Sequence, residues 1–126
     1  MLRQGPLSAR FHGLLEYLIG GFFIASPFIF SFDASAAVAI GVVGGIVLIV
    51  MAATAQTGPA LSGMVPVGIH VLLDVVVAAF LVATPFLFGF SDEAAPTGLF
   101  IGGGVLHLLV TIATRFLPAP SEAAVG

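Results

Sequence analysis

Two histidine–carboxylate pairs and one further histidine are the side chains of this sequence best suited to chemistry. His12 stands four residues before Glu16, and His70 stands four residues before Asp74. Residues at this spacing share one face of a helix, so each pair would place an imidazole beside a carboxylate. His107 adds a third imidazole later in the chain. Groups of these types can hydrogen-bond to each other, pass protons or bind divalent metals.

Three interpretations of these five residues stay open at this point. In the first, each histidine bonds its carboxylate and the pairs only clamp their helices, with roughly 0.6 kcal/mol for each bond inside a membrane. In the second, Glu16, Asp74 and His107 form a relay for protons or ions. In the third, His12, His70 or His107 ligates a metal or a haem. Because His-x-x-x-Glu specifies no particular ion, the sequence predicts no metal and no other cofactor.

Other features of the sequence argue against an enzyme. Cysteine is absent, which excludes a disulfide framework, a thiolate metal site and a cysteine nucleophile. The glycines at 102–104 lie within an apolar run, where no phosphate-binding loop between a strand and a helix can form. The net charge of −3 offers no basic surface for nucleic acid. We therefore predict neither catalysis nor nucleic-acid binding.

The composition indicates that lipid surrounds most of the chain. Of its 126 residues, 60% are apolar and only 7% are charged. A soluble domain carries roughly 25% charged residues to solvate its surface. We therefore expect a lipid bilayer as the main partner of the protein surface.

The two histidine–carboxylate pairs lie in a stretch that occurs twice. His12–Phe32 recurs as His70–Phe90, and identical pairs include His12/His70, Leu14/Leu72, Phe22/Phe80, Pro27/Pro85 and Phe32/Phe90. A repeat of this quality predicts two copies of one structural unit. If both copies cross the membrane in the same direction, a pseudo-twofold axis along the membrane normal would bring the two pairs together.

Four apolar runs, at about 12–32, 34–55, 67–90 and 97–116, are long enough to cross a hydrocarbon core of about 30 Å as helices. Their length and uniform apolarity exclude the alternating strands of a barrel. The sequence predicts an all-α fold, a four-transmembrane-helix bundle made of two tandem, parallel-oriented helical hairpin repeats. The single membrane domain, 1–126, divides into hairpin repeat 1 (11–55), a connecting loop (56–66), hairpin repeat 2 (67–117) and a flexible tail (118–126).

Small residues recur at four-residue spacing in the second and fourth runs, at Gly41 and Gly45 and at Gly98 and Gly102. Small residues let helix backbones approach closely in lipid, so these glycines predict helix packing. The contact could lie inside the bundle or against another subunit.

A short motif, Ser26-Pro27-Phe28, recurs as Thr84-Pro85-Phe86. Each proline removes one N–H and frees the carbonyl four residues earlier, which predicts a kink or an early helix end. The hydroxyl before each proline can bond a helix carbonyl. The phenylalanines that follow would form an interfacial aromatic belt or, alternatively, line a pocket for a lipid or quinone.

These motifs, each on the first helix of a two-helix repeat, resemble those of the SPW-repeat family of small prokaryotic integral membrane proteins. The resemblance covers about residues 11–117. It departs at the third motif position, where Phe28 and Phe86 replace tryptophan, and at Thr84, which replaces serine. The resemblance implies a four-helix architecture and a bacterial or archaeal cell membrane, and it supplies no catalytic residue.

The basic residues give the expected orientation. Arg3, Arg10 and Arg115 lie on the side of both termini, whereas Asp33, Asp92 and Glu93 lie on the opposite side. Short loops rich in arginine stay in the cytoplasm. We therefore expect a multi-pass protein of the cell (inner) membrane with both termini cytoplasmic.

The function that fits these features is a structural or accessory subunit, or a self-assembling scaffold, within a homo-oligomer or a larger membrane complex. The alternative is a small ion- or proton-conducting protein that uses the intramembrane histidines and carboxylates. The alternative requires polar groups in the outer half of the helices, where the sequence has almost none.

Overall fold

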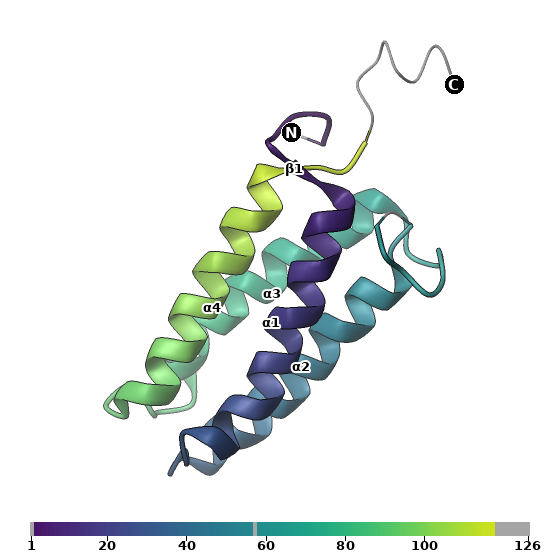
Figure 1. Cartoon of the computed structure of the whole chain (residues 1–126). Coiled ribbons are helices and arrows are strands. Elements are labelled where there is room, and N and C mark those ends of the chain that lie inside the picture. The colour runs from purple at the N-terminus through teal and green to yellow at the C-terminus, as the bar shows by residue number, and fades with distance from the viewer. Residues whose placement is uncertain (1, 57, 118–126) are drawn as a thin grey trace, which may run out of the picture.

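Four helices make up the fold in a computed structural model that describes residues 2–56 and 58–117. They are α1 (Ala9–Ile29), α2 (Ser35–Thr54), α3 (Val67–Leu87) and α4 (Ala94–Ala113). Helix α1 packs mainly on α2 and α3 mainly on α4, and the two hairpins form one bundle (Figure 1). The predicted all-α bundle of two hairpins is confirmed. The predicted tail, 118–126, lies outside the described residues.

The outer surface of the bundle is apolar. Each helix is long and apolar enough to cross a membrane. Large apolar side chains face outward along the helices, and Leu18 and Phe28 are 69% and 68% exposed. Apolar patches of this extent mark contact with lipid or with another protein. The chain is a small multi-pass membrane protein.

Helices α1 and α3 end earlier than the predicted boundaries at 32 and 90. After each helix one residue adopts a left-handed backbone, Ser31 with φ 50° and Gly89 with φ 74°. The amide that follows then donates to the proline carbonyl, which is a Schellman cap. The two bonds are equivalent in the repeats, at 3.0 Å for Phe32 N–H to Pro27 O and 2.9 Å for Phe90 N–H to Pro85 O.

The two left-handed positions predict opposite effects of substitution. Ser31→Gly should stabilise the fold by up to about 1 kcal/mol, because a residue with a Cβ is strained there. Gly89→Ala should destabilise it by about 1–2 kcal/mol for the same reason. A Cβ at Gly89 meets no other atom within 4 Å, so the backbone strain is the only cost. Unfolding in detergent, followed by circular dichroism, measures both. Effects of the same sign would contradict this account of the caps.

The residues of the repeated motif divide between the core and the lipid face. Ser26 and Thr84 are fully buried, and each hydroxyl donates to a carbonyl four residues earlier at 2.6 Å, as the sequence predicts. Phe28 and Phe86 point outward, whereas the last phenylalanine of each cap, at 32 and 90, is buried. At each helix end, the hydroxyl and the last phenylalanine therefore lie in the core, while the phenylalanine of the motif faces the lipid.

Glycines set the close approach within each hairpin. A Cβ at Gly45 on α2 would collide with the carbonyl oxygen of Gly20 on α1. At the equivalent place in the second hairpin, a Cβ at Gly104 would lie 2.9 Å from the Ala78 carbonyl oxygen. Gly41 also contacts α1, where a Cβ would lie 3.1 Å from the ring of Pro27.

Of the two contacts predicted for Gly98 and Gly102, the one inside the bundle is wrong, and the contact with another subunit stays a prediction. A Cβ at either position meets no described atom within 4 Å, so both glycines face outward from the bundle. The contacts of α4 fall instead on Gly103, which lies against the ring of Phe23, and on Gly104. The hydrophobic pattern of α4 did not reveal which edge of its glycine run faces inward.

The two ends of the described chain meet in a short ladder that the sequence did not predict. Strand β1 (Leu7–Ser8) pairs in parallel with β2 (Thr114–Arg115). Helix α1 begins before the expected residue 12 because the Ser8 hydroxyl accepts the Phe11 N–H at 3.2 Å and caps it. Helix α4 spans 94–113 and not 97–116, because proline is tolerated in its first turn and β2 follows its last.

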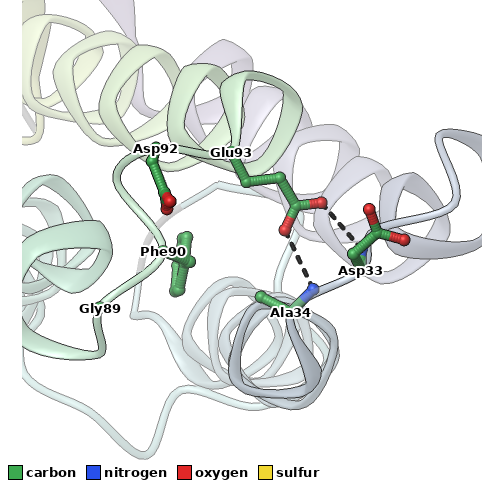
Figure 2. Close-up of a pocket in the computed structure, with 6 residues that line it drawn as sticks. All are labelled: Asp33, Ala34, Gly89, Phe90, Asp92 and Glu93. Carbon is green, nitrogen blue, oxygen red and sulfur yellow. Dashed lines mark hydrogen bonds between the residues drawn. The ribbon is translucent and has the colours of Figure 1, made fainter.

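At the end of the bundle away from this ladder, Glu93 joins the two hairpins (Figure 2). Its carboxylate accepts the N–H groups of Asp33 at 2.8 Å and Ala34 at 3.0 Å. Ala34 precedes α2, which has no side-chain cap of its own. A carboxylate from the second repeat thus meets the positive N-terminal end of α2.

Glu93→Ala should destabilise the fold by about 1–2 kcal/mol, because each hydrogen bond to a charged group contributes about 1.5–3 kcal/mol and solvent reduces this at a part-exposed site. Thermal unfolding in detergent micelles measures the loss. The matched control is Asp92→Ala, which removes an exposed carboxylate in the same loop. Equal losses in the two variants would contradict a specific role for Glu93.

Candidate functional site

The structure brings all five candidate residues together at the end of the bundle that carries the β1–β2 ladder. Helix α1 supplies His12 and Glu16, α3 supplies His70 and Asp74, and α4 supplies His107. Each of these residues is at most 3% exposed. We call these five residues the polar cluster.

The histidines and carboxylates of the polar cluster cross-pair between the repeats. His12 Nε2 lies 3.7 Å from Glu16 Oε2 on its own helix and 3.2 Å from Asp74 Oδ2 on α3. His70 Nε2 lies 3.4 Å from an oxygen of each carboxylate, and His107 Nε2 lies 3.5 Å from Asp74 Oδ1. Each carboxylate therefore contacts histidines of both hairpins.

Close distances in the polar cluster do not make well-directed hydrogen bonds. In the described part of the chain, every buried side-chain nitrogen or oxygen without a hydrogen-bond partner belongs to these five residues. The atoms include His12 Nε2, both oxygens of Glu16 and Asp74 Oδ1. Buried polar atoms normally have partners, so this concentration of unpaired atoms singles out the cluster.

Two threonines, Thr111 in the last turn of α4 and Thr114 directly after it, support the cluster, and the sequence-based prediction missed both. Thr114 Oγ1 donates its proton to Val110 O at 2.6 Å, so it can only accept from His12 Nδ1 at 3.2 Å. In a neutral His12 this places the proton on Nδ1 and leaves the Nε2 lone pair facing the carboxylates. Thr111 Oγ1 lies 3.3 Å from Asp74 Oδ2. Positions 107, 111 and 114 share one helical face, which was the available signal.

Aromatic rings close the cluster on both sides along the bundle. The ring of Phe116 packs against those of His12 and His70, with centroids 4.9 and 6.2 Å apart. Toward the far end, Phe23, Phe90 and Phe100 are buried and stack edge to face, with centroids 5.4 Å apart. Apolar side chains thus fill the core beyond the cluster.

The cluster breaks the pseudo-symmetry of the two repeats. His107 on α4 corresponds to Leu48 on α2, and both side chains are completely buried. The positions of Thr111 and Thr114 correspond to the buried Ala52 and Ala55. Helix α2 therefore presents an apolar face where α4 presents imidazole and hydroxyl groups.

The arrangement is chemically suited to holding a cation or sharing protons, and the described cluster contains only nitrogen and oxygen donors. The four ligand atoms that His12, Glu16, His70 and Asp74 can offer all lie within 4.8 Å of one another. The Ser26 and Thr84 hydroxyls, deeper in the helices, bond their own helix carbonyls and do not extend the cluster.

A comparison with protein families identifies one match. The family model described as the SPW repeat domain matches residues 10–114, a range that includes the four helices almost completely and the whole polar cluster. No curated protein and no solved structure matches the chain. The resemblance carried by Ser26-Pro27-Phe28 and Thr84-Pro85-Phe86 is confirmed.

Proposed function

We propose that this chain, which belongs to the SPW repeat family, is a structural or accessory subunit of a prokaryotic inner membrane, without catalysis of its own. In this role the polar cluster fastens the two hairpins to each other, and the apolar outer surface packs against further subunits. The proposal is supported chiefly by one observation: among the described residues, the buried ionisable groups are confined to one end of the bundle.

An ion or proton pathway would need polar groups through the whole thickness of the membrane. Phe23 follows Glu16 by two helical turns, and its ring stacks on that of Phe100 in the buried apolar core. The only polar side chains beyond this level in α1 and α3, Ser26 and Thr84, bond their own helices. This apolar barrier argues against conduction and favours a structural role.

The topology proposed is that both termini and the loop at 56–66 face the cytoplasm. Arg115 lies beside the N-terminal segment, where its side chain donates to Gly5 O at 3.1 Å. The acidic residues Asp33, Asp92 and Glu93 lie in the α1–α2 and α3–α4 connections, which are at the opposite end of the bundle (Figure 1). This charge distribution follows the positive-inside rule.

Assembly with a second copy or a larger complex is supported by an open groove between α1 and α4. Gly98 and Gly102 line it on α4, and its other lining residues are all apolar or glycine and include Leu15, Leu18 and Phe22 on α1. Bare glycines on a lipid-facing helix allow another helix to approach closely.

Native mass spectrometry of the full chain, released from lipid nanodiscs, tests the proposal. We expect a fixed stoichiometry, and we expect Gly102→Leu to dissociate it. Gly21→Leu is the matched control, because Gly21 is exposed on α1 and a Cβ there also meets no described atom within 4 Å. If the wild type and both variants are all monomeric, assembly through this groove is contradicted.

Proton flux into liposomes separates the proposed function from the alternative. A structural subunit should give no flux above that of empty liposomes, and Glu16→Gln with Asp74→Asn should leave assembly intact. Flux that the double variant abolishes would support the pathway and overturn the structural proposal.

A further inference from the structure

The donor set of the polar cluster is that of a transition-metal centre. Two imidazoles and two carboxylates converge from α1 and α3, and one ligand atom from each lies within 4.8 Å of all the others. Imidazole ligands favour zinc, copper, iron and nickel over magnesium and calcium, which prefer oxygen alone. The four residues come from two helices that are far apart in the sequence. Each pair on its own helix could form without the other, so their meeting at one place is an additional feature of the fold.

The spacing of these atoms fits a tetrahedral ion. Bonds of about 2.0–2.1 Å at tetrahedral angles place neighbouring ligand atoms roughly 3.3–3.4 Å apart. The two histidine Nε2 atoms lie 3.7 and 3.4 Å from Glu16 Oε2, and they face different oxygens of Asp74, at 3.2 Å for Oδ2 and 3.4 Å for Oδ1. The remaining separations are no greater than 4.8 Å, so small side-chain rotations would close the set around one ion.

The directions of the lone pairs favour a shared cation over direct hydrogen bonds. The contact between Thr114 and His12 Nδ1 leaves the Nε2 lone pair of neutral His12 facing carboxylate oxygens. Two lone pairs at this distance repel each other. A cation between them would turn the same geometry into coordination, and it would satisfy His12 Nε2, Glu16 and Asp74 Oδ1 at once.

The charge of the cluster agrees with a divalent ion. Metal ligation requires ionised carboxylates and neutral histidines, so Glu16 and Asp74 would then carry two negative charges in a buried site, where uncompensated charge is costly. Neutral histidines do not compensate them. One divalent cation would bring the net charge of the site to zero.

We propose that His12, Glu16, His70 and Asp74 bind one divalent first-row transition-metal ion of the zinc type. Nε2 of each histidine and one or more oxygens of each carboxylate are the ligands. Thr114 orients His12 through Nδ1, and Thr111 with His107 orients Asp74, which is the arrangement of supporting contacts common around metal ligands.

The ion would fasten α1 to α3, because each helix supplies one histidine and one carboxylate. This proposal rests on the structural role proposed above for the cluster, to which it adds a ligand. It is a structural site, since the protein fills four positions and Phe116 covers the histidines.

Zinc content of the purified chain is the first test. The full-length protein in mild detergent would be stripped with a chelator, incubated with Zn²⁺, desalted and measured by mass spectrometry of the metal. We expect about one zinc per chain, and X-ray absorption should give about four nitrogen or oxygen neighbours at about 2.0–2.1 Å. Less than about a tenth of one zinc per chain, or a shell without histidine scattering, would overturn the proposal.

Variants locate the ion within the molecule. Glu16→Gln and His70→Gln should abolish the zinc, and Thr114→Val should weaken its binding about 10–100-fold. Asp33→Asn with Asp92→Asn is the control, because these acidic residues lie in the α1–α2 and α3–α4 connections, at the end of the bundle away from the polar cluster. If this control alone loses zinc, the binding site lies at the far end of the bundle, and the assignment is overturned.

Two further readouts keep failures distinct. Circular dichroism establishes whether each variant is helical. If a variant does not fold, the X-ray absorption spectrum of the zinc-loaded wild type decides the proposal alone. A zinc-bound monomer would contradict the accessory function while upholding the metal site. A stable assembly that takes up no zinc would do the reverse.

Discussion

Asp74→Ala is expected to lower the free energy of unfolding by about 3–5 kcal/mol, the usual result of removing one partner from a buried charged group. Asp74 is completely buried, and its carboxylate lies within 3.5 Å of three histidines and of Thr111. Its loss removes the carboxylate that these histidines face and leaves the Thr111 hydroxyl only its bond to His107 O. Unfolding in detergent, followed by circular dichroism, measures the change, once with chelator and once with zinc.

Asp74→Asn and Asp92→Ala are the controls for this prediction. The amide keeps the shape of the carboxylate and one acceptor oxygen, so it should cost less than alanine. Asp92 is exposed in the far loop, and surface substitutions of this kind usually change stability by at most about 0.5 kcal/mol. An Asp74→Ala loss as small as that of Asp92→Ala would show that the cluster does not fasten the hairpins.

The fold could be predicted from the sequence because its two determinants are local. Apolar length defines the four spans, and the recurrence of His12–Phe32 as His70–Phe90 defines the two hairpins. The ends of the helices were predicted less well. The caps depend on a single left-handed residue after each helix, and serine at position 31 gives no sign of that conformation.

The polar cluster could be predicted only in part. Spacing of four residues placed His12 beside Glu16 and His70 beside Asp74, and the repeat suggested that the pairs meet. It could not show that Glu16 contacts His70 and that Asp74 contacts His12, since cross-pairing depends on how the hairpins dock. The sequence left a metal unspecified for the same reason. Coordination geometry exists only after α1 and α3 have packed.

The contact surface of α4 shows the other limit of sequence patterns. Gly98, Gly102, Gly103 and Gly104 all satisfy a rule that small residues pack helices, yet only the last two contact the bundle. In lipid both faces of such a helix are apolar, so hydrophobicity does not distinguish the core side from the outer side. The buried His107, Thr111 and Thr114 mark the inward face more reliably.

Gly45→Val is expected to have the largest effect of any single substitution at a helix contact, a loss of at least about 3 kcal/mol, at the upper end of the usual cost of overpacking. A Cβ at Gly45 would collide with the carbonyl oxygen of Gly20, and it would lie 2.7 Å from Ile24 Cγ1 and 3.0 Å from Ile24 N. Backbone atoms cannot rotate away as a side chain can. Helices α1 and α2 would have to separate along this contact.

Gly102→Val is the matched control, because it adds the same side chain at a glycine whose Cβ would meet no described atom within 4 Å. Its effect on unfolding of the isolated chain should stay within about 0.5 kcal/mol. Thermal unfolding of both variants in the same detergent gives the comparison. Equal destabilisation would mean that the first hairpin does not derive its stability from the Gly20–Gly45 approach. A normal melting temperature for Gly45→Val would contradict the packing of α1 on α2 itself.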